Sequence, residues 1–138
     1  MKKVISFMLA VLMLVSFVGC AKKQHEYNEG SWLTIRDDIE TNLANAKEKY
    51  IGEYYSFTGE AKYITEKDSF FVYEVNPGMY YLYGICCFVK DKELQETVLS
   101  LKEGDIVTIK GKITAIDKYN PMDGNGKISM NIYEITIK

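Results

Sequence analysis

Apolar side chains recur every three or four residues across positions 31–52, and this spacing predicts a helix with one apolar face. The stripe consists of Trp32, Ile35, Ile39, Leu43, Ala46 and Tyr50. A similar but shorter pattern predicts a second helix across 91–104, with Asp91 as its cap and Gly104 as its stop. The apolar stripe of the long helix needs a surface to pack on, so we expect it to cover another part of the fold.

Five further segments are rich in aromatic and β-branched residues, which predicts strands. They are 53–65, 68–75, 80–89, 105–117 and 127–138, with a loop at 118–126. Gly59 and Gly111 lie near the middle of the first and fourth strands, where a long strand can bend around a small barrel. This order predicts a mainly β protein with helices. The architecture is a five-stranded OB-fold barrel with an N-terminal helix and a helix between strands three and four.

Three stretches resemble the tRNA_anti-like family of OB-fold domains: "KYIGEYYSFTGEA", "ICCFVKDKELQETVLSLKEGDIVTIKGKI" and the closing strand. The resemblance covers about residues 33–137. It implies an OB-fold domain of a kind often carried by secreted bacterial lipoproteins. Its motifs belong to the fold and none is a catalytic signature, so the resemblance leaves the ligand open.

The chain begins with "MKKVISFMLAVLMLVSFVGCAKK", in which basic residues precede an apolar run and small residues follow it. This pattern predicts a secretory signal peptide over residues 1–19, because the apolar run is shorter than the roughly 18 residues of a membrane-spanning helix. "FVGC" at 17–20 resembles the bacterial lipobox, although Phe17 departs from the usual Leu or Val. The resemblance implies that Cys20 becomes the first mature residue and carries the lipid. The alternative is an ordinary cleaved signal with an incidental cysteine.

These segments predict a polar tether over 20–30 and an OB-fold domain with its N-terminal helix over 31–138. We expect a protein outside the cytoplasm that is attached to the bacterial membrane through the lipid on Cys20. Of 17 basic residues, Lys2 and Lys3 leave with the signal peptide, so 15 basic and 19 acidic residues give the mature chain a charge of −4. This negative net charge does not predict a basic surface that would attract nucleic acid or anionic lipid.

The hairpin predicted over 68–89 is rich in aromatic residues but contains no Lys or Arg. Alternation along a strand places about half of these rings in the core. The pattern leaves open which half this is, although Glu74 suggests that Phe71, Tyr73 and Val75 point inward. The hairpin rings that do not fill the core and the 118–127 loop form our candidate binding surface for an envelope protein, a peptide or a glycan. Its predicted residues are Tyr73, Tyr80, Tyr81, Tyr83 and Tyr119. The alternatives are rings that only fill the core, or a surface for single-stranded nucleic acid or an oligosaccharide. Nucleic acid is disfavoured because a stacking platform also needs a basic groove.

The residues with reactive side chains do not form a recognisable centre. Cys86 shares its strand face with Phe88, so we expect Cys86 in the core and Cys87 on the surface, with no disulfide between them. "DGNGKI" at 123–128 resembles a calcium loop but lacks the first and last carboxylate ligands. His25 is the only histidine and lies in the tether. We therefore expect no metal, no cofactor and no enzymatic activity.

Overall fold

The computed structural model describes residues 24–76, 83–120, 122 and 125–138. Cys20 and the predicted signal peptide lie outside these residues, as do Tyr80 and Tyr81. The elements are β1 (Asn28–Glu29), α2 (Trp32–Thr41), α3 (Leu43–Tyr50), β2 (Tyr54–Glu66), β3 (Ser69–Tyr73), β4 (Tyr83–Phe88), α4 (Lys92–Ser100), β5 (Ile106–Asn120) and β6 (Asn125–Ile137). None of the described helices is long and apolar enough to span a membrane.

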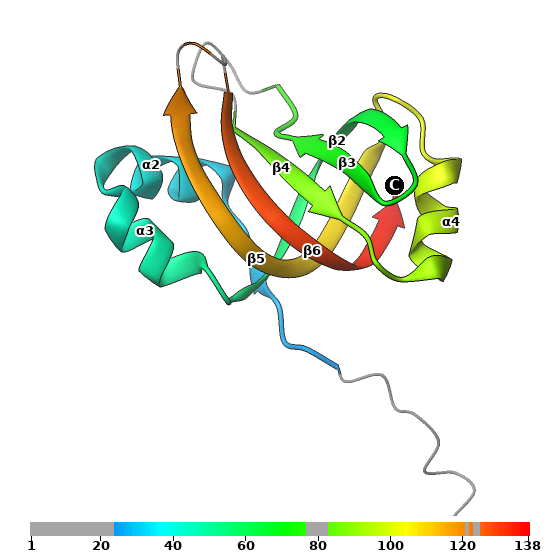
Figure 1. Ribbon diagram of the computed structural model, residues 1–138, viewed down its shortest axis with the longest axis horizontal. Coiled ribbons are helices and arrows are strands. Elements are labelled where there is room, and N and C mark those ends of the chain that lie inside the picture. Colours follow the sequence, from blue (N-terminus) through cyan, green and yellow to red (C-terminus); the bar gives the residue numbers. More distant parts are fainter. Residues whose placement is uncertain (1–23, 77–82, 121, 123–124) are drawn as a thin grey trace, which may run out of the picture.

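Strands β2 to β6 close into a barrel, which confirms the predicted OB fold (Figure 1). The order in the sheet is β1-β2-β3-β4-β6-β5, and β5 returns to pair with β2. Strands β4 and β6 are parallel, whereas the other barrel pairs are antiparallel. Helices α2 and α3 lie at one end of the barrel in this view and α4 lies at the other. As predicted, α4 lies between the third and fourth barrel strands in the chain.

The two mid-strand glycines allow the strands to cross closely. A Cβ atom on Gly59 would lie 2.3 Å from the carbonyl oxygen of Tyr73, and one on Gly111 would lie 2.2 Å from that of Asn131. The pairing of β5 with β6 also shifts its register between Lys110 and Gly111. Both positions therefore need glycine, and the register shift at Gly111 supports its predicted role in bending the strand.

The apolar stripe predicted as one helix forms two helices that break at Asn42. Asn42 has extended backbone angles, φ −156° and ψ 95°, and its side chain accepts a hydrogen bond from the Asn45 N–H at 3.2 Å. Asparagine favours such caps because its side chain competes with the helical backbone for hydrogen bonds. The stripe still packs on the barrel, since Ile35, Ile39 and Ala46 are buried. The single predicted helix was therefore too long, although its apolar face was right.

The inward face of the hairpin strands is the opposite of the predicted one. The fully buried side chains of β3, β4 and the neighbouring strand β6 include Phe70, Val72, Ile85, Cys87, Ile128 and Met130. Phe71 and Tyr73 therefore lie on the outer face, and Val75 is exposed. The prediction from Glu74 was wrong because β3 ends at Tyr73, so Glu74 lies beyond the strand. A carboxylate oxygen of Glu74 lies 3.5 Å from a guanidinium nitrogen of Arg36.

The structure also reverses the predicted placement of the neighbouring residues Cys86 and Cys87. Cys87 points into the core and is fully buried, whereas Cys86 lies on the outer face of β4. Cys86 is nonetheless only 5% exposed. Burial raises the pKa of both thiols, so neither is an activated surface thiol.

Candidate functional site

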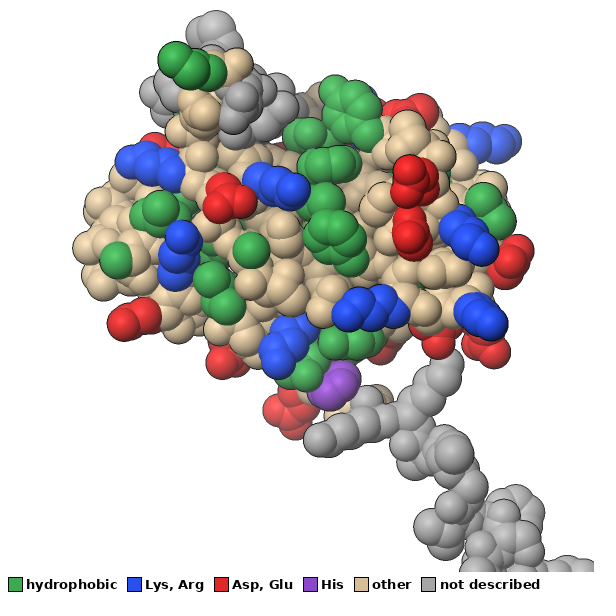
Figure 2. Space-filling view, in the orientation of Figure 1, with side chains coloured by type: hydrophobic (Ala, Val, Ile, Leu, Met, Phe, Trp, Pro, Cys, Tyr) green, Lys and Arg blue, Asp and Glu red, His purple; other side chains and the backbone are tan. Residues whose placement is uncertain are grey.

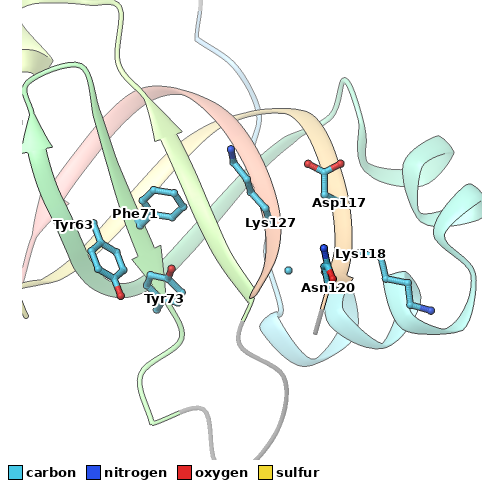
Figure 3. A pocket seen from close by; sticks show the side chains of 8 residues that line it. Tyr63, Phe71, Tyr73, Asp117, Lys118, Asn120 and Lys127 are labelled. Carbon is cyan, nitrogen blue, oxygen red and sulfur yellow. The ribbon is translucent and has the colours of Figure 1, made fainter. Parts of the chain in front are cut away.

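An open groove of about 520 Å³ crosses the outer face of the barrel (Figure 3). It is lined by Tyr63, Phe71, Tyr73, Asp117, Lys118, Asn120, Gly126 and Lys127. Figure 2 shows hydrophobic side chains gathered in a band over the middle of the face that carries β3, β4 and β6, with charged side chains beside the band. Its lining combines an aromatic wall, a polar wall and the small residue Gly126.

The aromatic wall consists of Tyr63, Phe71 and Tyr73. Phe71 and Tyr73 project from the same face of β3, and their rings are stacked with centroids 6.1 Å apart and planes 19° apart. Tyr63 from β2 meets Phe71 edge to face, with a centroid distance of 6.0 Å. Such offset and edge-to-face contacts are favourable arrangements for aromatic rings, so the wall is a preformed surface.

A β-bulge raises Tyr63 above the sheet. The pairing of β2 with β3 shifts its register between Lys62 and Glu66, and Tyr63 has φ 53° in the left-handed region. The next backbone N–H, that of Ile64, donates to a carboxylate oxygen of Glu103 at 3.0 Å. Tyr63 is 61% exposed as a result. A large residue held exposed in a strained conformation points to a functional role for its side chain.

Small, buried residues of β4 and β6 stand opposite the residues of the aromatic wall in the strand register. Phe71 pairs with Cys86, which pairs with Ser129, and Tyr73 pairs with Gly84 in the next row. A Cβ atom on Gly84 would lie 2.7 Å from the Tyr73 ring, so that ring lies flat across the glycine. Tyr73 is therefore only 9% exposed, and burial raises the pKa of its phenol.

The polar wall carries both signs of charge. Lys127 on β6 pairs in register with Asp117 on β5, and both line the groove together with Asn120. Lys118 points away from the aromatic wall (Figure 3) and its Nζ lies 3.5 Å from a carboxylate oxygen of Glu40. The polar wall therefore offers hydrogen-bonding groups without a run of unpaired positive charge.

The structure places the predicted surface residues in different environments. Tyr73 lines the groove, whereas Tyr83 is buried, with 4% of its area exposed. The Tyr83 hydroxyl donates to Glu40 and accepts the Tyr119 N–H at 3.0 Å. Burial, followed by the hydrogen bond to Glu40, raises the pKa of the Tyr83 phenol. Tyr119 is half-buried against the core. Tyr83 and Tyr119 thus join the barrel to helix α2, while Tyr80 and Tyr81 lie outside the described residues.

Sequence reasoning missed Tyr63, Asp117, Asn120 and Lys127 as parts of one site. Asp117 and Asn120 were assigned to a strand end and a loop, but β5 continues to Asn120. Phe71 was assigned to the core because the strand parity was inverted. No pattern in the sequence marks the bulge that exposes Tyr63. Among residues 24–76, 83–120, 122 and 125–138, no group of three or more His, Cys, Asp or Glu side chains could hold a metal ion.

No protein-family model and no curated protein matches this sequence. Similar solved structures include the mitochondrial single-stranded DNA binding protein Rim1 of S. cerevisiae, with 13% identity, a TM-score of 0.46 and coverage of 62% of this chain and 92% of that one. An OBody bound to hen egg-white lysozyme has 17% identity, a TM-score of 0.46 and coverages of 64% and 79%. The aspartyl-tRNA synthetase of Entamoeba histolytica has 11% identity, a TM-score of 0.49 and coverages of 86% and 22%. Identities and TM-scores this low say nothing about the ligand of this chain.

Proposed function

We propose that this protein is a non-catalytic binding module that is anchored outside the cytoplasm by a lipid on Cys20 and holds an uncharged sugar chain in its groove. The observation that carries the ligand class is the opposition of an aromatic wall and a charge-balanced polar wall. Tyr63, Phe71 and Tyr73 form the first wall, and Asp117 and Lys127, which stand opposite each other in the strand register, line the same groove. Ligand sites combine apolar surface with a few placed polar groups in this way.

Sugar rings suit both walls of the groove. The apolar face of a sugar ring can lie on the exposed ring of Tyr63 or the half-buried ring of Phe71. The sugar hydroxyl groups can bond to Asn120, Asp117 and Lys127. The surface around the second and third barrel strands is also where OB folds hold oligosaccharides and oligonucleotides.

A single-stranded nucleic acid is the second candidate, because the stacked Phe71–Tyr73 pair is a platform on which bases can stack. The charges around the groove favour the neutral ligand. Lys62 lies 3.0 Å from the Glu60 carboxylate, and Lys127 stands in register with Asp117. Phosphate groups supply most of the affinity of a non-specific nucleic-acid site, and here they would meet carboxylates as well as lysines.

The two ligand classes are separated by titration of the full chain in detergent micelles with chitopentaose, cellopentaose and the oligonucleotide dT12. We expect one of the sugars to bind with an affinity that is unaffected by salt between 20 and 200 mM, and we expect Phe71→Ala to weaken it by about tenfold, or ~1.4 kcal/mol. Tyr133→Ala is the matched control, because Tyr133 is an exposed aromatic residue outside the groove. Binding of dT12 that weakens steeply with salt would instead assign the groove to nucleic acid.

A further inference from the structure

The segment in front of the first helix is fixed to the barrel by an aromatic clasp, which consists of His25, Tyr27, Tyr54 and Tyr133. The His25 ring stacks on Tyr54 with centroids 4.2 Å apart and planes 14° apart. Tyr27 meets Tyr54 edge to face at 6.0 Å, and Tyr133 on β6 lies 5.6 Å from His25. The segment interpreted as a polar tether therefore packs against the barrel from His25 onward.

Backbone pairing strengthens this attachment immediately after the clasp. Strand β1 runs parallel to β2, with Asn28 opposite Tyr55, and the Gly30 N–H donates to the Ser56 carbonyl at 2.8 Å. The Asn28 side chain also donates to the Tyr54 carbonyl at 3.2 Å. A segment held by ring stacking and by backbone hydrogen bonds cannot swing freely around the domain.

The length of chain before the clasp limits how far the barrel can stand from a lipid on Cys20. His25 follows Cys20 by five residues. A fully extended chain of that length spans at most about 18 Å. If the acyl chains on Cys20 lie in the bilayer, the clasp must stay within this distance of the surface.

The chemistry of the clasp suits the headgroup layer of a membrane. Tyrosine rings combine an apolar body with a polar tip, and lysine side chains carry a charge on a long apolar stem. Lys112 Nζ lies 5.7 Å from the Tyr54 ring centroid and Lys110 Nζ lies 5.5 Å from that of Tyr27. Lys110 is also 3.0 Å from the Glu134 carboxylate. Asp91 and Glu93 line the same hollow as the clasp rings, so acidic groups surround the two lysines. The lipid on Cys20 must therefore supply the affinity for the membrane, and the clasp supplies the orientation.

We infer that the clasp face lies against the headgroups of the membrane that holds the Cys20 lipid, so that the ligand groove faces away from that membrane. The inference rests on the proposed anchoring at Cys20. Along β6, six residues separate Lys127 in the groove from Tyr133 in the clasp, or about 20 Å of strand. Figure 1 shows the first described residues leaving the barrel on one side, while β5 and β6 meet at the opposite side.

The orientation can be measured by energy transfer from a fluorophore on the chain to acceptor lipids in the membrane. The chain from Cys20 to Lys138, lipidated on Cys20, is placed in vesicles of phosphatidylcholine and phosphatidylglycerol. The fluorophore is attached through an azidophenylalanine at position 53 or 122, because Glu53 adjoins the clasp and Met122 is 95% exposed at the end of β5. We expect position 53 to lie measurably closer to the headgroups than position 122. Equal distances, or a shorter distance for position 122, would overturn the inference.

A paired variant tests whether the clasp itself sets the orientation. Replacing His25 and Tyr27 together by Ser removes the two rings of the segment, and we expect the difference between positions 53 and 122 to fall by at least half. Glu26→Ser is the matched control, because Glu26 lies between them and is exposed. Tyr63→Ala is a second control, since it removes an exposed ring on the groove side. An orientation that survives the paired variant would show that the clasp does not set it.

The anchoring through Cys20 and the orientation set by the clasp can be tested separately. Mass spectrometry of the chain purified from its native membrane detects the diacylglycerol adduct on Cys20, and its absence would refute the anchoring alone. The chain from Cys20 can then be coupled through the Cys20 thiol to maleimide phosphatidylethanolamine, because Cys86 and Cys87 are buried. The same energy-transfer measurement on this preparation would test whether the clasp orients a barrel attached at that residue.

Discussion

The backbone strain at Tyr63 can be tested by comparing the free energies of unfolding of two variants at this position. The change is a pair of variants, Tyr63→Ala and Tyr63→Gly. Both remove the same ring, so both lose the edge contacts with Phe71 and Tyr73, worth about 0.5–1.5 kcal/mol. They differ in the backbone: the left-handed conformation at φ 53° costs a residue with a Cβ about 1–2 kcal/mol. Glycine adopts this conformation without that cost. However, glycine has more conformational freedom to lose on folding, which makes the folded protein about 0.5–1 kcal/mol less stable than with alanine.

The relief of strain exceeds the entropy term, so we expect Tyr63→Gly to be more stable than Tyr63→Ala by about 0.5–1 kcal/mol. Urea unfolding measures the difference from the midpoints, provided that the two slopes agree. The same pair at Thr136, an exposed position in β6, is the control, and there alanine is expected to be the more stable. Both Tyr63 variants should weaken sugar binding equally, because both remove the same ring. Alanine being as stable as glycine at position 63 would refute a strained bulge.

Two further predictions concern residues that support the groove from outside it. Glu103→Ala removes the acceptor of the Ile64 N–H and releases the bulge, so sugar binding should weaken by about threefold to tenfold in titrations, whereas Glu103→Gln should retain most of it. Tyr83→Phe removes the hydroxyl that bonds to Glu40 and to the Tyr119 N–H and should cost about 1–3 kcal/mol in urea unfolding at pH 7. Because the pKa of Tyr83 is higher in the folded state, the stability that its phenol contributes is fully present below the unfolded-state pKa of about 10. This stability is lost as the pH rises above that value. The Phe variant should therefore lose less stability than the native chain between pH 9 and 11, and equal losses would contradict the assignment.

The groove and the clasp together describe a module with two different faces. The groove gathers stacked rings and polar side chains of both charges. The clasp gathers rings and lysines where the chain leads back to Cys20. In the proposed arrangement, one face meets the membrane and the other meets a sugar chain, so the short tether serves to present the groove rather than to let the barrel move freely.

Local patterns in the sequence were sufficient for the elements and their order. Spacing of three and four residues marked the helices, aromatic and β-branched runs marked the strands, and Gly59 and Gly111 marked the positions where strands cross closely. These features depend on near neighbours in the chain, which is why they predicted the OB-fold order without a structure.

Tertiary contacts decided the site. The inward face of β3 depends on which of two alternating sets of apolar residues meets the rest of the core, and both Phe70 and Phe71 are apolar. The exposure of Tyr63 depends on a bulge held by Glu103, 39 residues further along the chain. The docking of His25 depends on Tyr54 and Tyr133, which come from two different strands. Sequence periodicity reports which residues are apolar, but only the closed barrel determines which partners they meet.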